Sequence, residues 1–319
     1  MIRIVVAAAL IGLAALPAAA QDYPSRPVRI VFPLAAGGGG DVFTRALADE
    51  LQKAWKQPVV VENRPGGGQN IGARACAEAT PDGYTLCVMS SEPTAYNQFL
   101  YKSIPYDPEK DFQPISNLFF NTLAVVINGD TGVKTFAAMI ARAKAQPGKL
   151  SYGTFSFPAA VFMDKLNKAE GIDIVRVPYK GGGEVVNAVL AGSTPIAVLA
   201  LSNMVSLLQS GRITPLAVIA RSRSPLIPDA PTLAEVRPDA EVPNTWFGLW
   251  TQAAVPRAIV EKIAAETDRI IADPAFRKRM FIERGVEGAT ERLDDFVRFV
   301  AAERKLARQI VKESGLEPK

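Results

Sequence analysis

The sequence has no histidine among its 319 residues. This absence excludes a Ser-His-Asp or Cys-His triad, a histidine-ligated zinc ion and a histidine general base. The two cysteines are too few for a four-thiolate metal site. We therefore expect neither a metal site nor a cofactor.

Net charge and long hydrophobic runs are also scarce. The 36 Lys and Arg residues nearly balance the 32 Asp and Glu residues, so without a clustered basic patch the charge does not predict nucleic-acid binding. The 48% hydrophobic and 21% charged residues are typical of a globular protein. The length is about twice that of a typical domain and predicts two lobes or domains.

The one long apolar run lies at the N-terminus. Residues 1–20 contain one arginine, Arg3, an apolar stretch over 4–16 and then Ala18-Ala19-Ala20. This pattern predicts a secretory signal peptide cleaved near Ala20. A membrane anchor or a core helix is the weaker interpretation, because the stretch is short for a bilayer span. We expect a soluble exported protein.

An oxidising compartment would allow Cys76 and Cys87 to form a disulfide. Cys76 lies near the end of a predicted helix over 70–79, and Cys87 lies in a predicted strand over 84–89. The turn Pro81-Asp82-Gly83 reverses the chain between them, so the two side chains can face each other. The alternative is a pair of small buried core residues.

Strand and helix patterns alternate along most of the chain, and the last part is helical. Strands are predicted over 26–33, 57–62, 84–89, 122–127, 149–152, 172–177, 195–201 and 215–219. Helices are predicted over 42–55, 70–79, 135–145, 184–191, 256–272, 274–284 and 293–314. The repeated strand–loop–helix order predicts parallel sheets in α/β lobes. The last helix carries Leu293, Phe296, Val297 and Val300 on one expected apolar stripe.

Four glycines, Gly37–Gly40, stand between a strand and a helix. Such a loop suits a small anion, because glycines let the backbone approach a ligand and a helix N-terminus presents N–H groups. Val42 and Phe43 occupy the places where a dinucleotide fingerprint needs its last glycine, and no P-loop motif occurs. A carboxylate therefore fits better than a nucleotide, and a plain tight turn is the alternative.

Two charged residues stand beside these glycine loops. Asp41 is expected to cap the helix that follows it. Lys180 precedes another glycine loop, Gly181–Gly183. It either supplies charge to an anionic ligand or is a solvated surface lysine.

Six motifs resemble one family when taken in order. They are YPSRPVRIVFPLAAGGGGD, VVVENRPGGGQNIGA, PDGYTL, YDPEKDFQPIS, VPYKGGGE and RSRSPLIPDAPTLAE. Together they are similar to the periplasmic substrate-binding receptors of tripartite tricarboxylate transporters, the Bug family, from Tyr23 to the last helix. The resemblance implies an α/β, type II periplasmic-binding-protein fold, with two α/β lobes around a ligand cleft and a small carboxylate as ligand.

The same resemblance implies a division of the chain. After the signal peptide over 1–20, the first lobe is expected over 21–122 and 246–319, and the second over 123–245. The two crossings are expected near 118–125 and 242–248, after which the C-terminal helices return to the first lobe.

Family binding loops carry over to eighteen positions. The expected ligand-binding residues are Leu34, Ala35, Ala36, Gly37, Gly38, Gly39, Asp41, Ser90, Ser91, Thr94, Thr154, Phe155, Ser156, Phe157, Tyr179, Lys180, Gly181 and Leu199. The backbone N–H groups of the first loop should bind one carboxylate.

Three departures from the family pattern concern the ligand. Alanines stand at 35 and 36 where proline is usual, the loop over 153–158 is short and carries two phenylalanines, and Leu199 replaces an acidic residue. The last two remove polar groups, so we hypothesise a ligand with an apolar or aromatic body and one or two carboxylates, rather than citrate or an amino acid. The alternative is that Phe155 and Phe157 pack into the core of the lobe.

The expected function is a monomeric, non-enzymatic periplasmic receptor that delivers its carboxylate to the membrane permease subunits of a tripartite transporter. A ligand sensor that docks on a membrane histidine kinase would use the same site. An exported hydrolase or lyase is disfavoured, because Asp41, Glu92 and Glu184 show no spacing that marks a catalytic pair and no G-x-S-x-G motif occurs.

Overall fold

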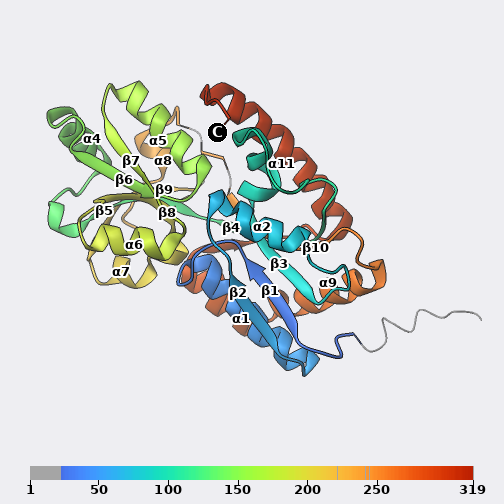
Figure 1. Cartoon of the computed structure of the whole chain (residues 1–319). Coiled ribbons are helices and arrows are strands. Elements are labelled where there is room, and N and C mark those ends of the chain that lie inside the picture. Colours follow the sequence, from blue (N-terminus) through green and yellow to red (C-terminus); the bar gives the residue numbers. More distant parts are fainter. Residues whose placement is uncertain (1–22, 221, 241, 244, 319) are drawn as a thin grey trace, which may run out of the picture.

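The computed structural model describes residues 23–220, 222–240, 242–243 and 245–318. These form two α/β lobes, each built on one β-sheet with helices on its faces (Figure 1). The predicted signal peptide over 1–20 lies outside the described residues. Within them, every helix is too short or too polar to cross a membrane.

The first lobe contains a six-stranded mixed sheet with the order β11-β4-β10-β3-β1-β2. Its strands are β1 (Val28–Phe32), β2 (Val59–Asn63), β3 (Thr85–Ser90), β4 (Phe112–Asn121), β10 (Thr245–Gln252) and β11 (Val286–Gly288). β1 pairs in parallel with β2 and β3, whereas β10 is antiparallel to both β3 and β4. The expectation of a parallel sheet is therefore right for β1–β3 and wrong for the half of the sheet that contains β4, β10 and β11.

Helices from both ends of the chain cover this sheet. They are α1 (Gly39–Trp55), α2 (Asn70–Ala77), α3 (Asn97–Leu100), α9 (Arg257–Ala272), α10 (Pro274–Met280) and α11 (Leu293–Ser314), with short turns η2 (Gly67–Gln69), η3 (Glu92–Tyr96) and η6 (Ile282–Arg284). α1 buries Phe43, Leu47 and Leu51, which recur every four residues and so lie on one face. These side chains share a core with Ile263 of α9, so the C-terminal helices do return to the first sheet.

The second lobe contains a five-stranded sheet with the order β7-β6-β8-β5-β9. Its strands are β5 (Leu123–Asn128), β6 (Leu150–Thr154), β7 (Ile174–Pro178), β8 (Ile196–Ala200) and β9 (Ile213–Ile219). Its helices are α4 (Phe136–Ala145), α5 (Phe157–Glu170), α6 (Gly182–Leu190), α7 (Val205–Gln209) and α8 (Leu233–Val236), with turns η4 (Gly129–Thr131) and η5 (Leu201–Asn203). β6 is parallel to β7 and β8, as expected, whereas β5 is antiparallel to β8 and β9, so the expectation of a parallel sheet is wrong for that part of the second lobe.

The chain changes sheet twice. It leaves the first sheet after Asn121, enters the second at Leu123, and rejoins the first at Thr245. Both changes fall inside the expected crossing segments. We therefore propose the expected limits for the two lobes, 21–122 with 246–319 and 123–245, except that Thr245, which begins β10, belongs to the first lobe.

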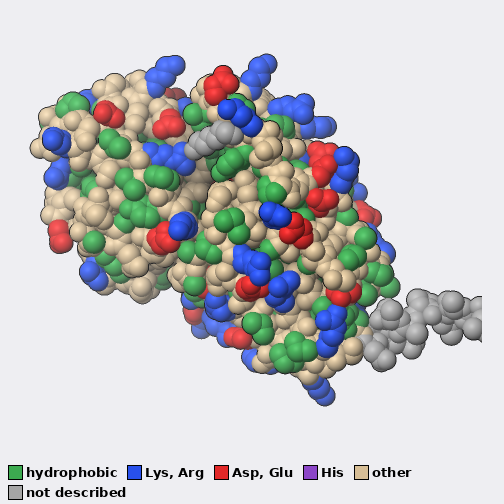
Figure 2. Space-filling view, in the orientation of Figure 1, with side chains coloured by type: hydrophobic (Ala, Val, Ile, Leu, Met, Phe, Trp, Pro, Cys, Tyr) green, Lys and Arg blue, Asp and Glu red, His purple; other side chains and the backbone are tan. Residues whose placement is uncertain are grey.

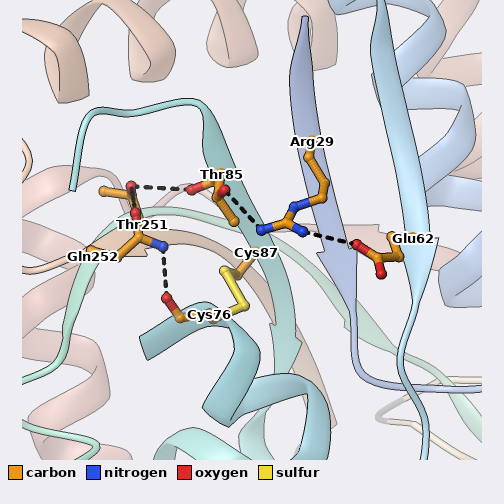
Figure 3. Close-up of a disulfide and its surroundings, with 7 residues drawn as sticks. All are labelled: Arg29, Glu62, Cys76, Thr85, Cys87, Thr251 and Gln252. Carbon is orange, nitrogen blue, oxygen red and sulfur yellow. Dashed lines mark hydrogen bonds and ion pairs between the residues drawn. A yellow bond between two sulfur atoms is a disulfide. The ribbon is translucent and has the colours of Figure 1, made fainter. Parts of the chain in front are cut away.

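A disulfide joins Cys76, near the end of α2, to Cys87 in β3 (Figure 3). Both residues are fully buried. The side-chain amide of Gln252, from β10, donates to the carbonyl oxygen of Cys76 at 2.7 Å. The disulfide therefore links α2 covalently to β3, and the hydrogen bond from Gln252 links the same helix to β10.

Phe296 is the largest fully buried side chain through which helix α11 docks on the first sheet, and Phe299 and Val300 pack in the same cluster. Phe296 is fully buried, with its ring centroid 5.7 Å from that of Trp246 and 5.1 Å from that of Trp250. A Cβ atom on Gly248 of β10 would lie 2.3 Å from the Phe296 ring, so only glycine permits this approach. Val297 is 47% exposed, so the predicted stripe is wrong there, because the next residue along a helix is turned away by about 100°.

Replacement of Phe296 by alanine should lower the free energy of unfolding by about 3–5 kcal/mol, because it leaves a large cavity against two tryptophans. Urea denaturation of Phe296→Ala and of Val297→Ala, the adjacent exposed position, measures the difference. Equal losses in the two variants would contradict this account of the docking.

Candidate functional site

The candidate site consists of two neighbouring interlobe pockets, which we treat as the two ends of one cavity because they share part of their lining. Both ends share Asn121, Phe155, Ala200 and Phe247. The glycine end is lined in addition by Phe32, Leu34, Ala35, Gly38, Gly40, Asp41, Gly182 and Asn203. The hydroxyl end is lined in addition by Ser90, Glu92, Leu123, Ser156, Val198, Leu199 and Thr245.

The glycine end lies at the N-terminus of α1. Gly38 is the N-cap of this helix and, having no side chain, makes no capping bond. The first N–H groups of a helix lack partners within the helix and carry partial positive charge, so they attract anions. One of them, the N–H of Gly39, donates to Oδ1 of Asn203 in the second lobe at 2.7 Å.

Both glycine loops lie where the lobes touch. A Cβ atom on Gly39 would be 2.3 Å from Oγ of Ser202, and one on Gly181 would be 3.1 Å from the backbone nitrogen of Ala35. The N–H of Ala35 also donates to the carbonyl oxygen of Lys180 at 3.3 Å. The glycines are therefore needed for the close approach of the two lobes.

Asp41 does not cap α1, contrary to expectation, because Gly38 holds that position. Its Oδ2 atom accepts from the N–H of Gly37 and from Nε of Arg45, each at 3.0 Å, and Oδ1 accepts from the amide of Asn63 at 2.8 Å. Burial alone would raise the pKa of Asp41, but these hydrogen bonds from Arg45, Gly37 and Asn63 outweigh it and hold the pKa below its ordinary value of 3.8. Asp41 thus fixes the shape of the glycine loop.

The hydroxyl end combines an acid with two unpartnered hydroxyl groups. Oε1 of Glu92 accepts from the N–H of Phe157 at 3.2 Å, and Oε2 accepts from Oγ of Ser90 at 2.5 Å. The hydroxyls of Ser156 and Thr245 are buried and have no hydrogen-bond partner among the described residues. An unsatisfied buried hydroxyl costs about 1–3 kcal/mol, so a polar group of a ligand placed here would gain hydrogen bonds.

Between the two ends the walls are apolar. Phe155 and Phe247 line both ends, and Leu199 lies at the hydroxyl end. Neither lining set contains a lysine or an arginine. An anion in this cavity must therefore be held by uncharged donors, namely backbone N–H groups, hydroxyls and the side-chain amides of Asn121 and Asn203.

Comparison with known proteins decides the family. A family model described as tripartite tricarboxylate transporter family receptor matches residues 43–316. This chain belongs to that family.

Several relatives of the receptor cover nearly its whole length. Protein BugT of Bordetella pertussis (strain Tohama I) is 32% identical over 314 residues, 97% of this chain and 95% of its own. Among solved structures, periplasmic binding protein BugD is 28% identical with a TM-score of 0.87. The match covers 93% of this chain and 100% of the BugD chain. R. palustris Rpa4515 with adipate is 27% identical with a TM-score of 0.87 and the same coverage. The predicted family and two-lobed α/β fold are confirmed.

Eight of the eighteen expected residues line the receptor's cavity. They are Leu34, Ala35, Gly38, Asp41, Ser90, Phe155, Ser156 and Leu199. The others lie beside it or contact other groups: Ala36, Gly37, Gly39, Ser91, Thr94, Thr154, Phe157, Tyr179, Lys180 and Gly181.

The structure gives several of these outer residues a different partner. Phe157 is buried with its ring 5.5 Å from that of Tyr96 in the first lobe, so it packs between the lobes and not into the core of its own lobe. The hydroxyl of Tyr179 lies 2.7 Å from that of Thr194. Lys180 is exposed, which fits the solvated alternative.

Several residues that line the cavity are not among the eighteen expected from the sequence. They include Asn121, Asn203, Thr245 and Phe247. Asn121 ends β4, and Thr245 begins β10. The chain changes sheet at both places, and the expected crossing segments already contained this signal. Asn203 had no such signal, because it reaches α1 from a short turn of the other lobe.

The receptor's cavity is small in this arrangement. Each end has a volume of about 10 Å³, which is room for about one water molecule. A ligand of several carbon atoms therefore requires the lobes to separate, and the two changes of sheet are the places where the chain can act as a hinge.

Asp41→Asn should lower the free energy of unfolding by about 1–2 kcal/mol at pH 7, because it weakens charge-assisted hydrogen bonds. A carboxyl group whose folded-state pKa is depressed stabilises the fold above its unfolded pKa and loses that contribution as the pH falls through the folded value. The difference between variant and wild type should therefore shrink below about pH 4. Urea denaturation at pH 7 and pH 3 checks this, and a difference that does not change with pH would contradict it.

Proposed function

We propose that the chain is a periplasmic solute receptor that binds a small carboxylate between its lobes and delivers it to the permease subunits of a tripartite tricarboxylate-type transporter. The observation that carries this proposal is the N-terminus of α1, which lies at a cavity without lysine or arginine. Family membership and the adipate held by the relative Rpa4515 support the ligand class.

The proposed ligand places its carboxylate at the glycine end, against the backbone N–H groups of the loop. Its body lies against Phe155, Phe247 and Leu199. These walls favour an apolar or aromatic body over a ligand with polar groups along its whole length. Citrate, with three carboxylates, is a poor match for such a cavity.

Closure of the lobes is the proposed transport signal. Bonds already cross between the lobes from Gly39 to Asn203 and from Phe157 to Glu92. A ligand that contacts both lobes stabilises the closed form and shifts the population toward it. The permease can then distinguish the loaded receptor, so no chemical step on the ligand is needed and we propose no catalytic role.

Export and the monomeric state belong to the same proposal. The predicted signal peptide directs the chain to the periplasm with cleavage near Ala20, and a Cys76–Cys87 disulfide suits an oxidising compartment. Positive and negative side chains are interspersed on the face shown in Figure 2. That face therefore offers no basic patch for nucleic acid, and we propose a monomer that binds none.

A carboxylate ligand should raise the melting temperature. At about 100 times its dissociation constant a ligand adds roughly 2.7 kcal/mol to the free energy of unfolding. A thermal-shift screen of aliphatic and aromatic acids, each paired with its uncharged amide, measures this. The proposal fails if no acid shifts the melting temperature, or if the amides shift it equally.

Gly39→Ala should weaken ligand binding by about tenfold or more, because its Cβ atom would lie 2.3 Å from Oγ of Ser202 when the lobes close. Calorimetric titration with an acid found in the screen gives the affinity. Ser202→Gly, added to Gly39→Ala, removes the nearest clashing atoms and should restore part of it. An unchanged affinity in Gly39→Ala would show that closure does not use this contact.

A further inference from the structure

Two helix N-termini border the interlobe cavity, and they differ in what they already bind. Both α1, at the glycine end, and α5, at the hydroxyl end, present the positive end of a helix dipole. At α1 the N–H of Gly39 binds a neutral amide oxygen, that of Asn203. At α5 the N–H of Phe157 binds a carboxylate oxygen of the protein itself, Oε1 of Glu92.

The negative charges at the two ends are also balanced differently. Asp41, at the glycine end, forms an ion pair with Arg45 at 3.0 Å. Glu92 takes part in none of the ion pairs found between described residues. It is only 6% exposed, so water screens its charge weakly. The hydroxyl end is therefore the end at which a second anionic group is repelled.

The two unpartnered hydroxyls lie at the same end. Ser156 and Thr245 are each 6% exposed and come from different lobes. Each hydroxyl can donate or accept a hydrogen bond, whereas the carboxylate of Glu92 can only accept. A ligand group that satisfies all three must therefore donate to Glu92 and can accept from the hydroxyls, as a hydroxyl or an amide does.

We infer that Glu92 makes this receptor selective for a monocarboxylate whose far end donates hydrogen bonds, and selective against dicarboxylates. The inference rests on the proposed function and specifies its substrate class. One carboxylate binds at the glycine end, and a hydroxyl or amide group at the far end contacts Glu92, Ser156 and Thr245. Discrimination comes from a built-in repulsion as well as from new contacts.

The test uses sets of three acids of matched length. Each set has a hydroxyl, a methyl group or a second carboxylate at the far end: 6-hydroxyhexanoate, heptanoate and adipate, or 4-hydroxybenzoate, 4-methylbenzoate and terephthalate. Calorimetric titration gives three dissociation constants for wild type, for Glu92→Gln, and for Glu313→Gln. The last is a control that removes the same charge from an exposed position on α11.

Wild type should bind the hydroxy acid at least about tenfold more tightly than the diacid of the same set. Glu92→Gln keeps an oxygen that can accept from Phe157 but removes the charge, so it should bind the diacid about tenfold more tightly than wild type does. Glu313→Gln should behave as wild type.

The outcomes separate the two claims. Carboxylate binding with the diacid equal to or tighter than the hydroxy acid in wild type overturns the inference and leaves the receptor function standing. The same holds if Glu92→Gln, folded by circular dichroism, keeps the wild-type ratio. If no acid of either set or of the wider screen binds, the proposed function itself fails.

Discussion

Close backbone contact between the two lobes is the constraint on which the site depends. Gly39 lies so close to Ser202 that a Cβ atom on it would collide with the other lobe, and a Cβ atom on Gly181 would be crowded against Ala35. This contact brings the N-terminus of α1 to the second lobe, where Asn203 binds it. Because the glycine loops of the two lobes meet this closely, the space left between the lobes at the glycine end is small.

The two ends of the cavity differ in what they can bind, and the end proposed to bind the anion does so without a histidine. An anion at the glycine end finds backbone N–H groups, which require no change of protonation. At the hydroxyl end Glu92 already occupies the N-terminus of α5. The relative Rpa4515 holds adipate, a dicarboxylate. We propose that the hydroxyl end of this chain suits an uncharged group instead of a second carboxylate.

Local patterns were enough to predict most elements, and tertiary contacts account for most errors. The β-branched strands β1, β2 and β5 stand close to their predicted positions, because each is a run of apolar residues between turns. The segment of β10 was predicted only as a crossing, because Gly248 interrupts its run of aromatic residues. A glycine is required there because the Phe296 ring, far along the chain, packs against it. α5 was missed because Pro158, read as part of a loop, sits in its first turn. The sequence did not distinguish Phe155 from Phe157. β6 ends before Phe155 and α5 begins at Phe157, so Phe155 lines the cavity whereas Phe157 contacts Tyr96.

A crystal structure of the receptor with the tightest-binding acid of the screen tests the central claim most directly. The account predicts closed lobes, a carboxylate about 3 Å from backbone nitrogens of the loop at Gly38–Gly40, and an uncharged far end beside Glu92. A carboxylate bound beside Glu92, or a ligand bound outside the interlobe cavity, would contradict it.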